Sequence, residues 1–343
     1  MSSQQPDVSV IIVTWNGRQH LEACLRAVAA QEDVVVETIL VDNGSVDGTA
    51  AYVAEAFPWV RMERLAENRG FAGGNNAGAR VARGRYLALL NNDTAPDPRW
   101  LRMLVDGLDE PNGFALTTSR LVYFDDPDVI DSAGDGFLRC GGAFKWHHGA
   151  RVSAAPDAGR DAALESREVF GVSGAACLMP LAIFEELDGF DEDFFASHED
   201  VDLSYRARLL GYRCRYVAGA VVRHRGSATL GRVSSFAVSH AQRNAEWLYL
   251  KNTPGTLLAT TLPGHLLYTA AAAVHFARQG LLATFLRAKW AAILGLPRML
   301  RKRTRIQATR RVGADRIAPM LEKNWLGLKL REKRFDTGSG ASA

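Results

Sequence analysis

Cysteine is scarce and scattered in this sequence of 343 residues, which contains only four. No C-x-x-C pair occurs, so the chain has neither the spacing of a structural zinc site nor the framework of a disulfide-rich fold. Unpaired cysteines fit a reducing compartment. A signal peptide is also missing, because residues 1–7 are polar and the apolar run that begins at Val8 is too short for one. We therefore expect a cytoplasmic protein.

Acidic residues are absent from Trp247 to Ala314, although the chain as a whole is nearly balanced, with a net charge of +3. Removing the eleven basic residues of this stretch from the total leaves about −8 for the rest of the chain. An acidic body with a basic end predicts an anionic partner for that end, either lipid headgroups or nucleic acid. The stretch lacks the interleaved aromatics of a nucleic-acid-binding module, so we expect a membrane surface and no nucleic acid.

Long uninterrupted apolar runs are missing as well. The segment 256–277 is apolar but is broken by Pro263, Gly264 and two histidines, which makes it a marginal spanning helix. Segment 280–300 mixes apolar residues with three basic ones, and Arg278 lies just before it, a composition typical of a helix lying in the membrane interface. A basic amphipathic helix that packs on the body of the protein is the alternative. We predict a basic helical region over 231–335, associated with the inner face of the membrane, and a disordered Gly/Ser-rich tail over 336–343.

The first 125 residues alternate between short apolar runs and helical patterns. Strands are expected over 8–14, 35–41, 60–65, 85–90 and 114–118, with helices over 20–30, 48–57, 74–83 and 99–108. This alternation predicts an α/β fold with a buried, mostly parallel sheet. In such sheets ligands bind beyond the carboxyl ends of the strands. Each of four successive strands is followed by small, polar or glycine residues, which begin at Thr14, Asp42, Asn68 and Asn91.

Each cluster alone suits an ordinary turn, but all four at one edge favour a nucleotide or phosphate crevice. The segment 125–168 is glycine-rich and weakly periodic, and we interpret it as an acceptor-side loop with little regular structure. Regular patterns return over 167–229. They predict a strand over 170–179, helices over 181–187 and 199–210, and a strand that ends at His224.

Six ordered motifs in this arrangement resemble the inverting glycosyltransferases of family 2. They are Val8–Asn16, Asp42–Thr49, Asn68–Gly78, Leu89–Thr94, Gly189–Phe195 and Glu199–Leu203. The resemblance covers about residues 8–229 and implies a GT-A fold, a Rossmann-like mixed sheet flanked by helices, with a helical extension after residue 230. The basic end is similar to bacterial rhamnosyltransferase-like members that act on lipid-linked or cell-surface glycans.

For the sugar donor, the resemblance implies a UDP- or dTDP-sugar. Asp42 would accept a hydrogen bond from a pyrimidine N–H, and Gly70 and Gly73 would allow close backbone approach. Asn76 would hold either a neighbouring loop or the nucleotide. The nucleotide pocket would also include Thr14, Asn16, Asn43 and Asn92.

Asn91-x-Asp93 occupies the place of the D-x-D motif of the family, and period-two spacing puts both side chains on one side of an extended segment. The resemblance makes Asp93 a ligand of Mg²⁺ or Mn²⁺, for which hard oxygen donors are suited. An asparagine is a weaker ligand, so Asn91 is either a ligand or a hydrogen-bonding neighbour of one. His224 is similar to the third ligand of some members, although a lone histidine is also compatible with a structural role.

The resemblance also implies a general base in the pair Glu199-Asp200, of which Asp200 is the predicted base. Acids at a helix start are also favoured by the helix dipole alone. Neighbouring carboxylates can raise one pKa into a useful range. Trp146 and His198 are candidates for contacts with the acceptor.

Three further motifs are absent. A Q-x-x-R-W motif is missing near Gln242, which favours transfer of a single sugar over processive synthesis. Neither a basic phosphate loop nor a G-x-G-x-x-G follows the first strand, which argues against a nucleotidylyltransferase and an NAD-dependent dehydrogenase. The expected function is metal-dependent, inverting transfer to a glycan or polyprenyl-linked hydroxyl in cell-envelope polysaccharide synthesis. A nucleotide-sugar-binding scaffold with a degenerate metal site is the alternative.

Overall fold

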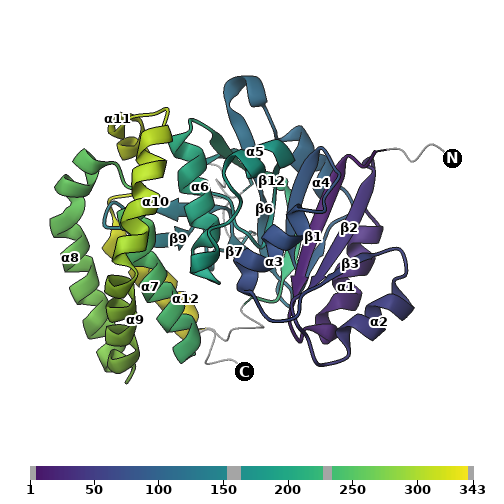
Figure 1. The fold of residues 1–343 in the computed structure, drawn as a ribbon, viewed down its shortest axis with the longest axis horizontal. Coiled ribbons are helices and arrows are strands. Elements are labelled where there is room, and N and C mark those ends of the chain that lie inside the picture. Colours follow the sequence, from purple (N-terminus) through teal and green to yellow (C-terminus); the bar gives the residue numbers. More distant parts are fainter. Residues whose placement is uncertain (1–4, 153–163, 227–233, 339–343) are drawn as a thin grey trace.

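A computed structural model describes residues 5–152, 164–226 and 234–338. Two blocks lie side by side in it, a sheet flanked by helices and a group of C-terminal helices (Figure 1). The strands of the main sheet run in the order β10-β12-β6-β11-β4-β1-β2-β3. Their bounds are β1 Val8–Thr14, β2 Val36–Asp42, β3 Arg61–Arg64, β4 Tyr86–Asn91, β6 Phe114–Tyr123, β10 Arg167–Val169, β11 Ala176–Pro180 and β12 Arg213–His224.

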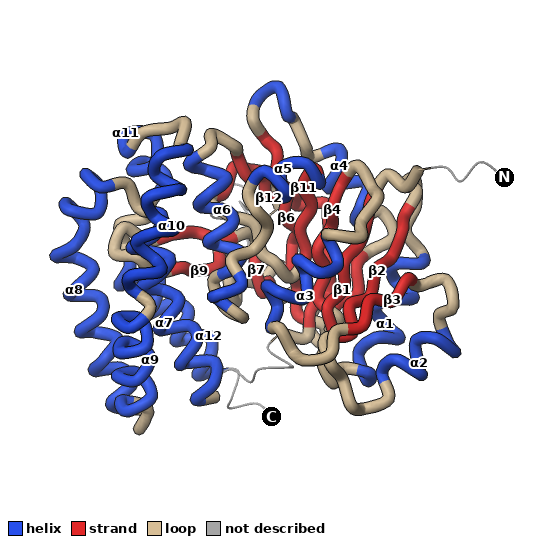
Figure 2. The backbone as a smooth tube through the Cα atoms, in the orientation of Figure 1, coloured by secondary structure: helices blue, strands red, loops and turns tan. Residues whose placement is uncertain are grey.

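The sheet is mixed and mostly parallel, as the alternating pattern predicts (Figure 2). β1 pairs in parallel with β2 and β4, and β6 pairs in parallel with β12. β11 is antiparallel to both of its neighbours. Two short strands extend the sheet at its edges, β5 (Thr94–Pro96) on β12 and β7 (Ile130–Ser132) on β6.

Helices cover both faces of this sheet, so its central strands are buried and read as continuous apolar runs. One face packs Ile11, Val41 and Leu89 against three helices, α3 (Gly70–Ala79), α5 (Leu181–Glu186) and α6 (Glu199–Leu209). The other face packs Val10, Ile12 and Leu90 against α1 (Arg18–Ala29), α2 (Thr49–Ala56) and α4 (Trp100–Asp106). The predicted helices and strands of the first 125 residues are therefore confirmed, with ends shifted by a few residues.

The segment 125–168 differs from the prediction of a loop with little structure. Besides β7, it forms a separate two-stranded sheet of β8 (Asp135–Phe137) and β9 (Ala143–Lys145). The strand expected over 170–179 is also wrong in extent. Only 176–180 form β11, since Gly171 instead pairs with Asp135 across an isolated bridge. A side chain at Gly171 would lie 2.8 Å from Ser204 of α6, so the backbone passes close to that helix.

The region after residue 234 is helical, as predicted, while the predicted boundary at residue 230 lies outside the described residues. Its helices are α7 (Ser235–Asn252), α8 (Gly255–Arg278), α9 (Leu282–Leu294), α10 (Leu296–Thr309), α11 (Ala314–Ile317) and α12 (Trp325–Gly338). The single helix expected over 280–300 is two helices. The chain bends at Gly295, where a Cβ atom would lie 2.5 Å from the ring of Trp247. α12 continues to Gly338, so residues 336–338 of the predicted disordered tail are helical, and 339–343 lie outside the described residues.

The C-terminal helices share a hydrophobic core with the sheet block. Tyr205 and Leu209 of α6 pack with Trp247, Ala292 and Met299. Buried ion pairs reinforce the contact, because Lys251 of α7, 1% exposed, lies 2.5 Å from Asp191 and 2.7 Å from Asp202. The helical region is therefore fixed directly on the segment 189–202, which carries two of the six motifs.

Candidate active site

The carboxyl ends of β1, β2 and β4 meet at one edge of the sheet. Thr14 pairs with Asp42, and Val13 pairs with Asn91, so the three strands end in register. The polar residues that follow these strands therefore lie side by side. This is the edge at which the sequence predicts a nucleotide.

Asp42 and Asn43 lie at the end of β2 and are almost completely buried. The Asp42 carboxylate accepts a hydrogen bond from the Ser45 backbone at 2.9 Å. The Asn43 side chain donates to Asn68 and to the Gly70 carbonyl, both at 3.0 Å, and accepts from the Arg69 backbone at 2.9 Å. Asn43 thus connects β2 to the loop that begins α3 and holds that loop beside Asp42.

Thr14, Asn16 and Asn92 form a similar connection around the end of β1. Asn92 donates to the Thr14 hydroxyl at 2.9 Å, and a side chain at Gly17 would collide with the Asn92 amide at 2.3 Å. Asn16 has a φ of 50° and accepts a hydrogen bond from the Val46 backbone at 2.9 Å. These residues therefore hold together the loops that follow β1, β2 and β4.

Gly70, Gly73 and Asn76 of α3 face the segment 189–195. Gly70 has a φ of +72°, and a Cβ atom there would lie 2.3 Å from the Phe195 carbonyl oxygen. A Cβ atom at Gly73 would lie 2.8 Å from the Arg69 side chain. The Asn76 amide bonds the backbone of Phe190 at both its nitrogen and its oxygen, and it also donates to Glu192. At Gly70 and Gly73 the structure shows α3 and its preceding residues packed closely against other protein segments. Two roles are expected for Asn76, and the structure shows the first of them, holding a neighbouring loop.

Asn91, Asp93 and His224 converge at the end of β4. His224 Nε2 lies 3.4 Å from Asp93 Oδ1 and 3.5 Å from the Asn91 side-chain amide. β12 brings the histidine there, because His224 pairs with Thr94 of β5. Asp93 and His224 are 6% and 5% exposed. Asp93 and His224, two predicted metal ligands that are far apart in the chain, are therefore neighbours.

His224 is oriented by Asp131, whose Oδ2 lies 2.8 Å from His224 Nδ1. Burial opposes a charge on this imidazole, but the neighbouring carboxylates of Asp131 and Asp93 outweigh it and raise the pKa of His224 to about 9. Asp131 also pairs with Lys145 at 2.9 Å, and the positive charge of Lys145 helps to hold the pKa of Asp131 well below its usual range despite burial. The raised pKa favours the imidazolium form of His224; a cation at Nε2 would bind the neutral form, in which Nδ1–H is donated to Asp131.

These side chains fit a divalent cation, although the set is small. Asp93 Oδ1 is buried and has no hydrogen-bond partner, which leaves a carboxylate oxygen free for a metal. The Asn91 amide can present its oxygen by a flip of the side chain. Among the residues described, no group of three or more His, Cys, Asp or Glu side chains is arranged to hold a metal. A cation here would therefore complete its coordination with donors from outside the chain, such as phosphate oxygens and water.

The carboxyl groups at the start of α6 form a second cluster. Asp200 accepts hydrogen bonds from the Gly174 backbone at 2.9 Å and from its neighbour Val201 at 2.8 Å. Glu199 is 6% exposed, and its Oε2 has no hydrogen-bond partner. Asp135 of β8 is equally buried and lies close enough to Asp200 for their charges to interact.

The pKa values of these three carboxyl groups separate their roles. Burial raises the pKa of Glu199 and of Asp135 well above the usual range, and the negative charge of Asp200 adds to both effects. Burial also raises the pKa of Asp200, but hydrogen bonds from two backbone N–H groups and the charge of Lys145 oppose it. The pKa of Asp200 is thus raised less than those of Glu199 and Asp135, so Asp200 is the member of the three whose environment best suits a base.

Of the two candidates for acceptor contacts, His198 directly precedes the Glu199-Asp200 pair, while Trp146 follows β9. Trp146 packs edge-on against Phe144, 4.8 Å between ring centroids, with the Arg167 guanidinium over its face. His198 precedes α6 with a φ of 72° and borders a small cavity among the C-terminal helices.

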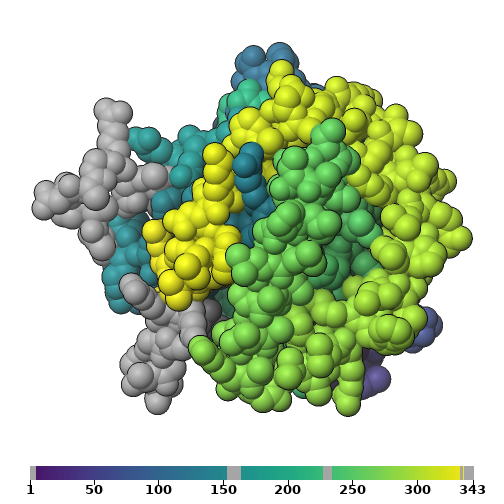
Figure 3. All heavy atoms as spheres, turned by 90° about the vertical axis from the view of Figure 1, so that its left-hand side faces the viewer, coloured from purple at the N-terminus to yellow at the C-terminus, as the bar shows by residue number. Residues whose placement is uncertain are grey.

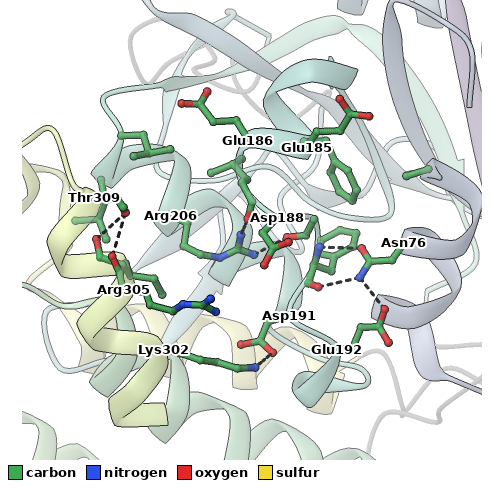
Figure 4. Close-up of a pocket in the computed structure, with 18 of the residues that line it drawn as sticks. Asn76, Glu185, Glu186, Asp188, Asp191, Glu192, Arg206, Lys302, Arg305 and Thr309 are labelled. Carbon is green, nitrogen blue, oxygen red and sulfur yellow. Dashed lines mark hydrogen bonds and ion pairs between the residues drawn. The ribbon is translucent and has the colours of Figure 1, made fainter. Parts of the chain in front are cut away.

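A larger cavity, of about 730 Å³, lies between α3, α5, α6 and α10 (Figure 4). Its wall carries both charges, since Asp191, Arg206, Lys302 and Arg305 line it. Of the predicted nucleotide-binding residues only Asn76 borders it, and neither Asp93 nor Asp200 does. The predicted site residues therefore converge at the strand ends and, apart from Asn76, lie outside this cavity.

Comparison with known proteins identifies the family of this chain. The family model for glycosyl transferase family 2 matches residues 9–184, just over half of the chain. The chain belongs to glycosyl transferase family 2. It is a glycosyltransferase, and the sheet order, the flanking helices and the C-terminal helices confirm the predicted GT-A fold.

Two bacterial relatives of this family 2 chain are similar over different lengths. The succinoglycan biosynthesis protein ExoO of Rhizobium meliloti is 38% identical over 105 residues, 30% of either chain. The N-acetylglucosaminyl-diphospho-decaprenol L-rhamnosyltransferase of Mycobacterium tuberculosis is 28% identical over 270 residues, which span 69% of this chain and 85% of that protein. The second match supports the rhamnosyltransferase-like character that the motifs suggest.

Two solved structures share the fold. GalNAc-T7, solved with UDP, GalNAc and Mn²⁺, has a TM-score of 0.56 at 17% identity, over 73% of this chain and 48% of that chain. Residues 1–349 of TarS from S. aureus, solved with UDP, have a TM-score of 0.50 at 14% identity, over 84% of this chain and 92% of that chain. At these identities the likeness extends to the fold alone.

Three charged residues of the glycosyltransferase site were missed in the sequence. Asp131, Asp135 and Lys145 all come from the segment interpreted as a loop, and they lie between the His224 cluster and the Asp200 cluster. No periodicity marks them, because each sits in a strand of only three residues. An isolated acid in a glycine-rich segment has the same appearance in the sequence as an ordinary turn residue.

Proposed function

We propose that this glycosyltransferase transfers a single sugar, with inversion, from a UDP- or dTDP-sugar to a hydroxyl group of a glycan or polyprenyl-linked acceptor in cell-envelope polysaccharide synthesis. The observation that carries the proposal is the setting of Asp200, a carboxylate that accepts hydrogen bonds from the Gly174 and Val201 backbone beside the buried acids Glu199 and Asp135. The other cluster, of Asp93 and His224, belongs to the same edge of the sheet. Donor and acceptor would meet between them.

The nucleotide would lie over the ends of β1 and β2. Asp42 would accept a hydrogen bond from the pyrimidine N–H, and Thr14, Asn16, Asn43 and Asn92 would keep the surrounding loops in place. Gly70, Gly73 and Asn76 would not contact the nucleotide; they would hold α3 against the segment 189–195. Rigid loops reduce the entropy that is lost when a ligand binds.

Asp93, His224 and the Asn91 amide would hold Mg²⁺ or Mn²⁺, and Asp131 would fix the tautomer of His224. When bound, a divalent cation neutralises charge on the diphosphate of the donor. The unpartnered Asp93 Oδ1 supports this role, since a buried carboxylate oxygen without a partner is otherwise costly.

Asp200 would take the proton from the acceptor hydroxyl as that oxygen attacks the anomeric carbon. The new glycosidic bond forms on one face while the bond to the nucleotide diphosphate breaks on the opposite face, and the leaving group keeps the electron pair. Inversion follows from this single displacement. The neutral Glu199 beside Asp200 would limit repulsion at the moment the base is charged.

The acceptor class is suggested by the mycobacterial relative, whose name specifies an N-acetylglucosaminyl-diphospho-lipid. Peripheral binding to the inner face of the membrane would suit such a substrate. Large apolar side chains are exposed on the outer faces of α8 and α9, and Leu266, Leu267, Leu286, Trp290 and Leu294 are each at least 54% exposed. The basic residues of the same region would face anionic lipid. Among the described residues, α8 is the one helix that is long and apolar enough to cross a membrane.

Product analysis would test the proposal. Purified protein is incubated with Mg²⁺ or Mn²⁺, with octyl-diphospho-GlcNAc as acceptor, and with UDP-, GDP- and dTDP-sugars in turn. We expect transfer from one UDP- or dTDP-sugar, and NMR of the product should show an anomeric configuration opposite to that of the donor. Retention would overturn the proposed mechanism. Nucleotide-sugar binding without turnover on any acceptor would favour the scaffold alternative.

A further inference from the structure

A second, smaller cavity lies between the start of α6, the base helix that carries Asp200, and the C-terminal helices. It has a volume of about 160 Å³, room for several water molecules, since one occupies about 30 Å³ in the liquid. β9, α7, α8, α9 and α12 supply its walls through Ala143, Glu246, Tyr268, Lys289 and Lys329. His198, two residues before Asp200, also lines it.

Basic side chains outnumber acidic ones in the lining of this cavity. Lys289 and Lys329 contribute two ammonium groups, and Glu246 is the acidic residue that lines the cavity within the described part of the chain. Lys289 donates to Glu246 and to the Gln242 carbonyl, while Lys329 donates to the Ala143 carbonyl at 2.9 Å and to Glu332 at 2.7 Å. An ammonium group has three N–H donors, so each lysine keeps one donor beyond these contacts.

Both lysines face the start of the base helix. Burial and then the charges of Lys329 and Lys289 lower the pKa of His198 to about 4, so the imidazole there is neutral and the two cations are its neighbours. His198 and Asp200 are two residues apart, which limits the distance between their Cα atoms to about 7 Å. β9 also connects the cavity to Asp200. Ala143 lines the cavity, while the charge of Lys145 interacts with Asp200 and its ammonium group pairs with Asp131.

The walls of the cavity are fixed by tight packing. Gly141 has a φ of +90°, and a Cβ atom there would lie 2.8 Å from the Tyr249 ring; one at Gly142 would lie 2.7 Å from the Tyr268 hydroxyl. His265 of α8 bonds the Cys140 carbonyl and Glu246, both at 2.8 Å. The two glycines thus allow the loop between β8 and β9 to contact α7 and α8 directly.

α8 separates the cavity from the exposed apolar surface. Tyr268, Thr269 and Ala272 of α8 line the cavity, while Leu266, Leu267 and Val274 of the same helix are more than half exposed. In the space-filling view, part of the chain in the blue-teal range of β8 and β9 is visible in a hollow between the green α8 and the yellow α12 (Figure 3). A carboxylate base, a cationic cavity and an apolar surface therefore follow one another across the molecule.

We propose that this cavity binds the diphosphate group of a lipid-linked acceptor, between a sugar at Asp200 and a lipid on the face of α8 and α9. The inference rests on the proposed function, because it assigns the acceptor side of the same reaction. Phosphate oxygens would take the remaining donors of Lys289 and Lys329 as charge-assisted hydrogen bonds. The anion would have to be a diphosphate or phosphate ester that is attached to an apolar chain.

Two acceptors that differ only in the diphosphate provide the test. Octyl-diphospho-GlcNAc and octyl β-GlcNAc are compared on the wild-type protein, on Lys289→Gln, on Lys329→Gln and on the double variant. We expect the wild type to show a KM at least tenfold lower for the diphosphate acceptor, and the double variant to lose most of that preference. Turnover at saturation and the KM for the donor should change less than threefold. Lys323→Gln is the control, because Lys323 is exposed and lies outside the cavity.

A variant that weakens both acceptors equally, or neither, would overturn the inference. Calorimetric titration of octyl-diphospho-GlcNAc into the same proteins keeps the inference testable if no transfer to either acceptor is detected. Binding that the double variant weakens tenfold would then support the cavity while the proposed reaction fails, and absence of binding would overturn both. Flotation with phosphatidylglycerol vesicles separates the two sources of phosphate. If the double variant loses vesicle binding but keeps its preference for the diphosphate acceptor, the cavity serves a lipid headgroup and the inference is wrong.

Discussion

Asp131 and His224 are 93 positions apart in the chain, yet Oδ2 of the first lies 2.8 Å from Nδ1 of the second. Asp131 comes from the short strand β7 and His224 from the end of β12, and both strands flank β6. This contact orients the imidazole so that Nε2 faces Asp93. It links a segment without a recognisable motif to the predicted metal site.

Replacement of Asp131 should weaken metal binding. Loss of a group that orients a ligand typically lowers metal affinity 10- to 100-fold, and we expect about this for Asp131→Ala. Asp131→Asn keeps an acceptor for the Nδ1–H of His224 and should lose less. Electron paramagnetic resonance of free Mn²⁺, in the presence of nucleotide, measures the affinity without reference to activity. Asp126→Asn is the control, since Asp126 is exposed in the same segment; unchanged affinity in a folded Asp131→Ala protein would contradict the prediction.

Replacement of Asp200 should abolish most transfer while leaving donor binding intact. General base catalysis contributes roughly 10²- to 10⁴-fold, so Asp200→Asn should lower kcat by about that factor. Glu199→Gln should lower it much less, because Glu199 is already held neutral and glutamine has a similar shape. Initial rates and nucleotide titrations measure the two effects, with the exposed Glu55→Gln as control. The opposite ranking of Asp200→Asn and Glu199→Gln would assign the base to Glu199.

As the pH is lowered, the rate of transfer should begin to fall at a higher pH than it would with an ordinary aspartate as the base. Burial raises the pKa of Asp200, although the Gly174 and Val201 backbone and Lys145 oppose the effect. A base must be deprotonated, so a raised pKa increases the protonated, inactive fraction at any given acidic pH. The profile of kcat/KM against pH should therefore show its acidic limb above the usual value of about 3.9. Circular dichroism over the same range checks that the fold persists; a limb at or below 3.9 would contradict the assignment.

Removal of the Lys251 ammonium should destabilise the protein strongly. Lys251 is 1% exposed between Asp191 and Asp202, and removal of one partner from a buried ion pair typically costs about 3–5 kcal/mol. Lys251→Met should therefore lower the free energy of unfolding in urea by about this amount. Arg26→Ala breaks an exposed pair with Glu22 and should cost less than about 1 kcal/mol. Equal effects of the two variants would show that the buried contact between α7 and the segment 189–202 is not important for stability.

Binding to anionic membranes should depend on the outer face of α9. Trp290 is 61% exposed, and Trp290→Ala or Leu286→Asp should reduce flotation with phosphatidylglycerol vesicles severalfold. Raising the salt concentration should weaken binding as well, because attraction of the basic residues to lipid is screened. Trp59→Ala is a matched control, since Trp59 is 48% exposed but lies in the sheet block after α2. Loss of flotation in Trp59→Ala alone would place the membrane contact elsewhere.

The central strands and the strand-end residues could be predicted from the sequence because their physics is local. Apolar β-branched runs such as Val8–Thr14 have the composition of strands buried on both faces, and parallel strands bring their polar ends to one edge. Thr14, Asp42 and Asn91 therefore had to be neighbours once β1, β2 and β4 were parallel. Glu199 and Asp200 likewise begin α6 as the sequence predicts.

Only the tertiary structure decided which side chains complete these clusters. Asp131, Asp135 and Lys145 sit in three-residue strands, too short for periodicity to mark, and their positions depend on pairing with β6 and on the bridge to Gly171. The same holds for the C-terminal helices. Their basic, apolar composition was evident from the sequence, but their fixation by Lys251 and Trp247 and the cavity beside His198 arise from contacts between distant segments. Composition determines whether a segment can be buried, whereas contacts between distant segments determine which residues it packs against.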